Sequence, residues 1–213
     1  MKYLIFILAA LAVSVPAAQA GGVAKPLTGT AAKASGLQTA AKAAAKQFKK
    51  YTMDNDYFSC AIPAAWTLER EKDKDEEYKI YEIQLLAPET GKAPTSIFVS
   101  YYAKENEDFA GYQDFIDRNS KNVAGETKSE RETFEPVKKT VLGGRQGFEL
   151  ARVRLVYLHP ESKSDESVKL KEKLYVLPAK EGFYVLNFSA PEVSFLKHLK
   201  VFEQVASSFK AKP

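Results

Sequence analysis

The chain has 213 residues, of which 45% are hydrophobic and 12% aromatic, and its formal net charge is +4. A charge this mild argues against a dedicated nucleic-acid-binding protein, and the composition is that of an ordinary globular protein. Cys60 is the single cysteine, so an intramolecular disulfide is excluded and stability has to come from a packed core.

Residues 1–20 have the pattern of a cleaved secretory signal peptide. Lys2 precedes an apolar run over residues 3–15, and Ala18-Gln19-Ala20 forms a small-residue cleavage signal. The apolar run is shorter than the roughly 20 residues that a membrane-spanning helix needs. No cysteine follows the cleavage signal, so lipid anchoring at that position has no acceptor. We therefore expect a periplasmic or secreted protein that is soluble after signal cleavage.

Residues 21–50 are rich in Ala and Lys and poor in large apolar side chains. Residues 39–50 have strong helix propensity and place Lys42, Lys46 and the pair Lys49-Lys50 along one side of a helix. One interpretation is a basic helix that touches an anionic membrane or partner. The other is a solvated tether, which we favour because alanine methyl groups bury little area.

Residues 51–213 are expected to form one folded domain, which begins with strands. The expected strands before its first helix are 58–62, 66–71, 78–87 and 95–103. Alternating apolar positions, or a high content of β-branched and aromatic residues, favour strands in these segments. Cys60 lies on the large-residue face of the first strand, so we interpret it as a small buried hydrophobe. The charge run over 72–77 is expected to be a solvated hairpin tip.

A helix is expected between the two halves of the domain. Asp108 could cap it, and Phe109, Tyr112 and Asn119 follow at helical spacing. We predict three to four turns, followed by a polar loop over 125–134.

Two hairpins are expected next. The Gly143-Gly144 pair supplies the positive φ angles that a tight turn requires in the first hairpin. A polar loop separates the two hairpins. Their expected strands are 136–142, 145–158, 167–177 and 183–189.

An amphipathic helix closes the chain. Ser189 and Glu192 have the spacing of a capping box, and large apolar or small residues recur at steps of three and four. The residues of this stripe are Phe195, Leu199, Phe202, Ala206 and Phe209. Hairpins with one helix between them and one at the end predict an α+β fold with an antiparallel sheet.

Cations recur on two of the expected strands. The candidate partner-binding residues are Arg152, Arg154, Lys169, Lys171 and Lys173. Side chains alternate along a strand, so the three lysines share one face, and pairing of the two strands would gather the cations on one side. One interpretation is a docking surface for an acidic partner or an anionic headgroup. The other, which we favour, is an exposed edge strand that its lysines protect from aggregation. Glu149 and Glu172 dilute the positive charge.

The sequence contains no motif of a catalytic, cofactor or metal site, and no residue is assigned to such a role. It lacks the G-x-S-x-G, H-E-x-x-H, P-loop and dinucleotide signatures. Neither His159 nor His198, which we place on the polar side of the last helix, has a second histidine at zinc-ligand spacing. The acidic run over 73–77 lacks the glycine and terminal glutamate of a calcium loop. We therefore expect a protein that is not an enzyme.

Four stretches carry a resemblance to a known family. They are Phe58-Ser-Cys-Ala-Ile62-Pro63-x-x-Trp66, Val141-Leu-Gly-Gly144-Arg-x-Gly147-Phe-Glu, Phe183-x-Val-Leu-Asn-Phe-Ser-Ala-Pro191 and Phe202-x-x-x-Ala206-Ser-Ser208-Phe209-Lys210. Together they make residues 57–210 resemble the PsbP-like superfamily, named for an extrinsic subunit of photosystem II.

The resemblance implies an antiparallel β-sheet packed between helices, the PsbP-like α-β-α sandwich, which agrees with the patterning above. It also implies non-catalytic docking, since family members bind photosystem II or a small GTPase of nuclear import. Neither partner carries over, because the family's metal-binding and partner-binding residues have no matching motif here. We expect an exported module that docks to a protein partner in the cell envelope, and its cations would suit an acidic partner. The alternative is a protein that binds a small apolar ligand among its many aromatic side chains.

Overall fold

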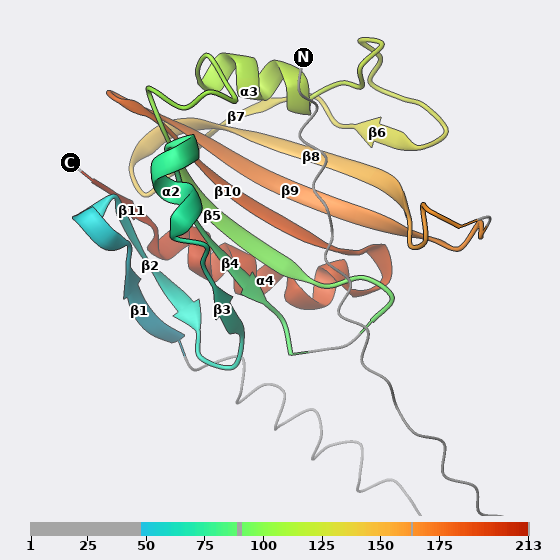
Figure 1. Cartoon of the computed structure of the whole chain (residues 1–213), viewed down its shortest axis with the longest axis horizontal. Helices are drawn as coiled ribbons and strands as arrows, with labels where there is room; N and C mark the ends of the chain where they lie inside the picture. The colour runs from blue at the N-terminus through green and yellow to red at the C-terminus, as the bar shows by residue number, and fades with distance from the viewer. Residues whose placement is uncertain (1–47, 89–90, 163, 213) are drawn as a thin grey trace, which may run out of the picture.

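The computed structural model describes residues 48–88, 91–162 and 164–212 (Figure 1). The expectations for residues 1–47, including the signal peptide and most of the Ala/Lys-rich segment, lie outside the described residues. Within the described parts, no helix is long and apolar enough to cross a membrane.

A twisted eight-stranded sheet forms the centre of the molecule (Figure 1). Its order is β3-β4-β5-β10-β9-β8-β6, and β7 also pairs with β8. The strands are β3 (Thr67–Glu69), β4 (Ile80–Leu86), β5 (Ser96–Ala103), β6 (Glu132–Phe134), β7 (Lys138–Leu142), β8 (Arg145–Tyr157), β9 (Ser167–Ala179) and β10 (Gly182–Pro191). All neighbouring strands run antiparallel, which confirms the predicted sheet type.

A second, three-stranded sheet joins the two ends of the described chain. Its order is β1 (Phe48–Thr52), β2 (Phe58–Pro63) and β11 (Lys210–Ala211), and the short 3-10 helix η1 (Asp54–Asp56) connects β1 to β2. Residues 48–50 were expected in the Ala/Lys-rich segment, whose end was predicted to be helical, but they belong to β1. Pairing with β2 overrides their helix propensity.

Helices cover both faces of the large sheet, as the predicted α-β-α sandwich requires. Along β10, Leu186 and Phe188 pack in a core with β2 and α4 (Glu192–Ser208). The alternate residues Phe183 and Val185 pack on the other face with α3 (Tyr112–Asn119). Successive side chains of a strand point to opposite faces, so β10 contributes to two cores at once.

The closing helix packs through the predicted stripe. Phe188 lies 4.8 Å from Phe195 and 5.4 Å from Phe202 between ring centroids. Phe202 and Phe209 are buried as well, whereas Leu199 is half-buried. The predicted capping box is wrong: Ser189 still belongs to β10, helix α4 begins only at Glu192, and no side-chain hydrogen bond caps its N-terminus.

Glycine fixes two of the turns. Gly143 and Gly144 have φ angles of +56° and +80°, so the predicted turn of the β7–β8 hairpin is confirmed. Gly182 opens β10 with a φ of +134°, and a side chain there would overlap with the backbone oxygen of Tyr102 on β5. The position where β10 enters the sheet therefore requires glycine.

Three local predictions are wrong. The charged run 72–77 is not a hairpin tip, because α2 (Asp73–Tyr78) forms there. Helix α3 starts at Tyr112 and has only eight residues, since the preceding loop is held instead by Asn106, whose Oδ1 accepts a hydrogen bond from the backbone N–H of Phe109. The loop expected over 125–134 contains the short strand β6, which pairs with β8.

Phe202→Ala should lower the free energy of unfolding by about 3–5 kcal/mol, because its ring fills the space between Tyr175 and Phe188. Leu196→Ala on the exposed side of the same helix should change it by less than about 0.5 kcal/mol. Urea unfolding followed by circular dichroism measures both. Equal losses would contradict the placement of the buried stripe.

Candidate partner-binding surface

Arg152 and Arg154 converge on one buried carboxylate. Strand β8 pairs with β9 so that Arg152 lies opposite Glu172, whose side chain is only 1% exposed. The Nε of Arg152 donates to one carboxylate oxygen of Glu172, and the Nη2 of Arg154 lies 2.9 Å from the other. Arg152 also donates to the Oδ1 of Asn119 at the end of α3, at 3.2 Å.

This arrangement makes the two arginines structural. A buried carboxylate is costly unless ion pairs and hydrogen bonds satisfy it, and the two guanidinium groups do so here. The bond to Asn119 ties the end of α3 to the sheet. The charge of one arginine is cancelled by Glu172, and Arg152 itself is largely covered. These residues are therefore poor candidates for contact with a partner.

The three lysines lie on the opposite face of the sheet. Lys169, Lys171 and Lys173 alternate with the residues of β9 that face α3, so they point to the side of α4. The Nζ of Lys171 lies 5.1 Å from the ring centroid of Phe195 on α4. The Nζ of Lys173 lies 3.3 Å from the Oε2 of Glu149, and Lys169 is exposed. The structure thus divides the five predicted cations between two faces.

The lysines do not protect an edge strand, the interpretation that the sequence favoured. Strand β9 is an interior strand, hydrogen-bonded to β10 on one side and to β8 on the other. Lysine on an exposed edge prevents unwanted strand pairing, but β10 pairs with β9 as far as Leu170, so Lys171 and Lys173 lie on no free edge and only Lys169 lies beyond the paired stretch. The lysines therefore need another explanation. We call Lys169, Lys171 and Lys173 the β9 lysine row.

Lys173 stays charged at neutral pH. Burial opposes the charged form, but contacts with Tyr175 and Glu149 outweigh it and raise the pKa of Lys173 above its ordinary value. Among the described residues, Lys169 and Lys171 form no ion pair within 4 Å. Positive charge on the β9 lysine row is thus only partly neutralised by the protein itself.

Two exposed apolar residues of α4 were missed from the sequence. Val193 and Leu196, on the first two turns of α4, are 99% and 76% exposed. The helical stripe that includes Phe195 predicts only which side of α4 is buried. The signal that could have found them is that both residues lie off that stripe in an otherwise polar face.

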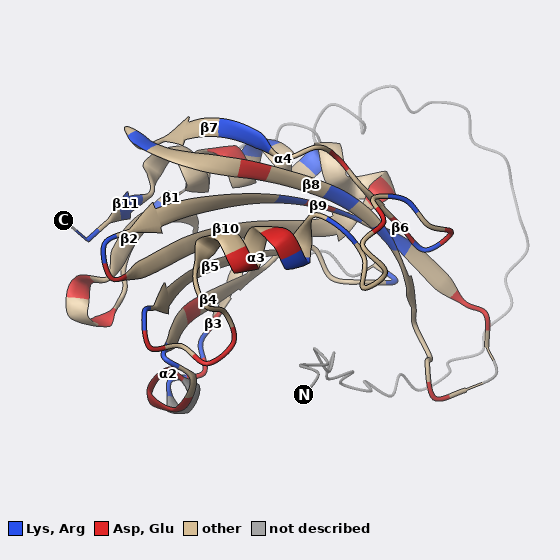
Figure 2. Ribbon diagram, turned by 90° about the horizontal axis from the view of Figure 1, so that it is seen from above, with Lys and Arg blue, Asp and Glu red and all other residues tan. Residues whose placement is uncertain are grey.

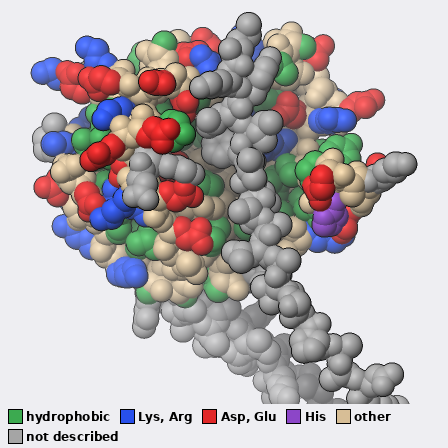
Figure 3. Space-filling model, viewed as in Figure 1, with side chains coloured by type: hydrophobic (Ala, Val, Ile, Leu, Met, Phe, Trp, Pro, Cys, Tyr) green, Lys and Arg blue, Asp and Glu red, His purple; other side chains and the backbone are tan. Residues whose placement is uncertain are grey.

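Elsewhere the surface charge is mixed. In Figure 2, blue segments on β7, β8 and β9 mark Lys and Arg positions, with acidic positions among them. The face seen in Figure 3 likewise shows acidic and basic side chains intermingled. The overall charge therefore does not single out a binding surface, whereas a local row of cations does.

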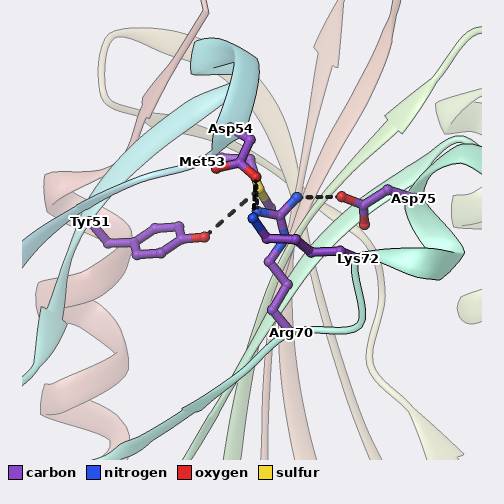
Figure 4. A network of polar contacts seen from close by, with 6 residues as sticks. All are labelled: Tyr51, Met53, Asp54, Arg70, Lys72 and Asp75. Carbon is purple, nitrogen blue, oxygen red and sulfur yellow. Dashed lines mark hydrogen bonds and ion pairs between the residues drawn. The ribbon is translucent and has the colours of Figure 1, made fainter.

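A second ion-pair network connects the small sheet to the large one (Figure 4). Arg70, after β3, donates to Asp75 of α2, and its Nη1 lies 2.8 Å from the Oδ2 of Asp54 in η1. The Nζ of Lys72 lies 2.9 Å from the same oxygen. Hydrogen bonds from Lys72 and Arg70 lower the pKa of Asp54. The network joins three connecting segments, and we assign it a structural role.

The cysteine and the two histidines, the candidates for a nucleophile or a general base, lie either in the core or in an exposed loop. Cys60 is buried, as predicted, at 2% exposure, and burial raises the pKa of its thiol to about 12. His198 was expected on the polar side of α4, but it is 7% exposed and meets the edge of Trp66 at 5.7 Å, because the buried side of α4 is wider than the predicted stripe. His159 is in an exposed loop near Glu166. The described residues contain no cluster of three or more His, Cys, Asp or Glu side chains suited to a metal ion.

Many aromatic side chains pack on one another. Tyr57 lies 4.3 Å from Tyr81 and 4.8 Å from Tyr101, and Tyr101 lies 4.9 Å from Tyr184. The hydroxyl of Tyr184 donates to the backbone oxygen of Tyr57 at 3.0 Å. These tyrosines hold the loop before β2 against the large sheet, so they act as packing elements.

No protein-family model and no curated protein matches the sequence. Similar solved structures include cyanobacterial PsbP (CyanoP) from Synechocystis sp. PCC 6803, at 15% identity and a TM-score of 0.49, covering 78% of this chain and 92% of that one. LpqN of Mycobacterium tuberculosis, described as involved in cell envelope biogenesis, is 14% identical with a TM-score of 0.46, over 78% and 91% of the chains. The Ran-binding protein Mog1p of Saccharomyces cerevisiae is 10% identical with a TM-score of 0.45, over 78% and 95%. A PsbP protein is thus among the similar structures. Likeness at this level carries no information on function.

Glu172→Gln should lower the free energy of unfolding by about 2 kcal/mol, because two arginines lose their charged acceptor in a buried setting. Glu149→Gln on the neighbouring strand should cost less than about 1 kcal/mol, since its pair with Lys173 is partly exposed. Denaturant titration of both variants tests this difference. A larger loss for Glu149→Gln would contradict the structural role of the arginine pair.

The Cys60 thiol should resist a disulfide reagent at about pH 8 until the protein unfolds, because it is buried and its pKa is raised to about 12. Since the folded pKa exceeds the unfolded value of about 8.5, the thiol's contribution to stability is complete below that value and declines as the pH rises toward 12. Labelling with and without denaturant measures accessibility. Rapid labelling of the folded protein would contradict the buried position.

Proposed function

We propose that this protein is an exported, non-catalytic module that docks to an acidic protein partner in the cell envelope through the β9 lysine row. The observation that carries the proposal is the alignment of three lysines on one face of β9. Edge protection does not account for Lys171 and Lys173, because β9 is paired with both β8 and β10 there. Export rests on the signal-peptide pattern of residues 1–20.

The spacing of the row suits a specific docking contact. Alternate residues of a strand are roughly 7 Å apart, so the three lysines start from evenly spaced backbone positions along β9. Acidic side chains at matching intervals on a partner could meet them in one orientation. Such complementary charge raises the association rate and fixes the register of a complex.

The chemistry of the described residues supports binding over catalysis. Cys60 is held in its neutral form by burial, and a neutral thiol is a poor nucleophile. His198 contacts Trp66 in the core, and the nearest charged neighbours of Arg152 and Arg154 are their own structural carboxylate. Of the five predicted cations, the proposal retains the three lysines and assigns the two arginines to the fold.

The double variant Lys169→Glu/Lys171→Glu should reduce capture of the partner from an envelope extract about tenfold, because attraction becomes repulsion. The unchanged protein should also lose its partner as salt is raised, since exposed charges are screened. Lys173 is left in place because it pairs with Glu149.

The matched control is Lys104→Glu/Lys121→Glu, which makes the same charge change at two exposed lysines outside β9. It should retain the partner. If the β9 variant captures the partner at full strength while its thermal unfolding is unchanged, the lysine row is not the docking surface.

A further inference from the structure

A row of apolar side chains on β8 belongs to neither core. Val153, Leu155 and Tyr157 alternate along the strand and are half-buried. The register places Val153 opposite Lys171, so the row lies on the α4 side of the sheet, beside the β9 lysine row. In the described part of the chain, the three side chains neither join a core nor pack against one. We call them the β8 apolar row.

The β8 apolar row lies where a second helix would fit beside α4. Helix α4 packs on β10, where Phe188 contacts Phe195 and Phe202. Strand β8 is two strands away from β10 (Figure 1). Neighbouring strands are about 4.8 Å apart, so the two positions are separated by roughly 10 Å. Helices that pack side by side are about 8–10 Å apart, so a helix over this row would lie at contact distance from α4 and extend the same layer.

The length of the row matches a short helix. Alternate strand residues are roughly 7 Å apart, so the row from Val153 to Tyr157 spans about 14 Å. A helix rises about 1.5 Å per residue, so nearly three turns cover this distance. Apolar side chains at positions i, i+4 and i+7 of such a helix would face the row, and its flanks would face the residues on either side.

Those flanking residues are cationic. Lys169 and Lys171 follow the row on β9, and the Cζ of Arg131, just before β6, lies 5.3 Å from the ring centroid of Tyr157. Among the described residues, none of these three cations forms an ion pair within 4 Å. The row is therefore bordered by unneutralised positive charge on both sides.

Most carboxylates on the same side of the sheet are already paired. The Oε2 of Glu149 lies 3.3 Å from the Nζ of Lys173, and the Oε2 of Glu135 lies 3.5 Å from the Nζ of Lys138. Glu192, directly after β10, is one further carboxylate at the end of the lysine row. Three unpaired cations against this single carboxylate favour an acidic occupant.

The shape of the row favours a protein segment over a bilayer. Its three side chains are half-buried, and insertion into a lipid headgroup layer needs apolar side chains that protrude. An apolar helix ridge, in contrast, packs on a half-buried row of this kind. We propose that the β8 apolar row and its bordering cations receive an amphipathic helix of the partner, with an apolar ridge between Asp and Glu side chains. The inference rests on the proposed docking function and names the element that docks.

Synthetic peptides test the chemistry of the occupant. The probe is a fluorescein-labelled helical peptide of about 18 residues, with leucines at i, i+4 and i+7 and glutamates on both sides of them. It should bind the purified protein at least about tenfold more tightly than a peptide with lysine in place of every glutamate. It should exceed by a similar factor a peptide of the same composition whose leucines do not share one side. Fluorescence anisotropy measures all three.

Val153→Thr/Leu155→Thr should weaken binding of the acidic peptide about tenfold, because apolar contact is lost while β-branched side chains keep the strand. Thermal unfolding should change little, since neither side chain belongs to a core. The matched control Val141→Thr removes an exposed apolar side chain of β7 and should bind as well as the unchanged protein. If the double variant unfolds, amide chemical-shift changes in the unchanged protein locate the peptide, and they should centre on residues 153–157.

Two peptide results would overturn the inference. They are equal binding of the acidic and basic peptides, and full binding by Val153→Thr/Leu155→Thr. It is also wrong if the row binds anionic vesicles more tightly than the acidic peptide, or if sedimentation shows a dimer that this variant abolishes, because the occupant is then a bilayer or a second copy.

Partner capture separates this inference from the proposed function. If Lys169→Glu/Lys171→Glu loses the partner while Val153→Thr/Leu155→Thr keeps it, docking through the lysines stands and the helix is wrong. If both variants lose the partner, both proposals are supported. If both keep it, both fail.

Discussion

Strand β10 has to be covered on both faces, and most of the architecture follows from this constraint. Its residues alternate between a core shared with α4 and the small sheet and a core shared with α3. Both cores depend on large aromatic side chains, so the fold requires helices on both sides. Gly182 lets the strand enter the sheet beside the backbone of β5. The surfaces available for function are therefore the outer sides of the covering elements and the uncovered ends of the strands.

Burial also decides which charges are available for binding. Glu172 lies on the α3 side of β9, where it is nearly inaccessible, and it holds Arg152 and Arg154 in place. Lys169 and Lys171 lie on the other side of the same strand and have no carboxylate partner among the described residues. Two sets of cations that look equivalent in the sequence thus have different roles. One set offsets the cost of a buried carboxylate, and the other leaves positive charge on the surface.

The sheet topology changes the meaning of the lysine row. Lysines along an edge strand would be explained by protection against aggregation, but β9 is paired on both sides from Leu170 onward, where Lys171 and Lys173 lie. The row leaves positive charge on the α4 side of β9, where Lys169 is exposed and Lys171 is half-buried.

The sequence by itself determined the antiparallel sheet, the Gly143-Gly144 turn, the buried side of α4 through Phe195 and Phe202, and the buried state of Cys60, because local periodicity and glycine conformation encode them. It also placed the three lysines together, since they are on one strand. Only the tertiary structure decided that Arg152 and Arg154 lie on the opposite face, because a one-residue change in strand register exchanges the two faces. Strand order likewise made β9 an interior strand, and packing against Trp66 buried His198. Residues 48–50 became a strand because β2 offered them a hydrogen-bonding partner that local propensity does not reveal.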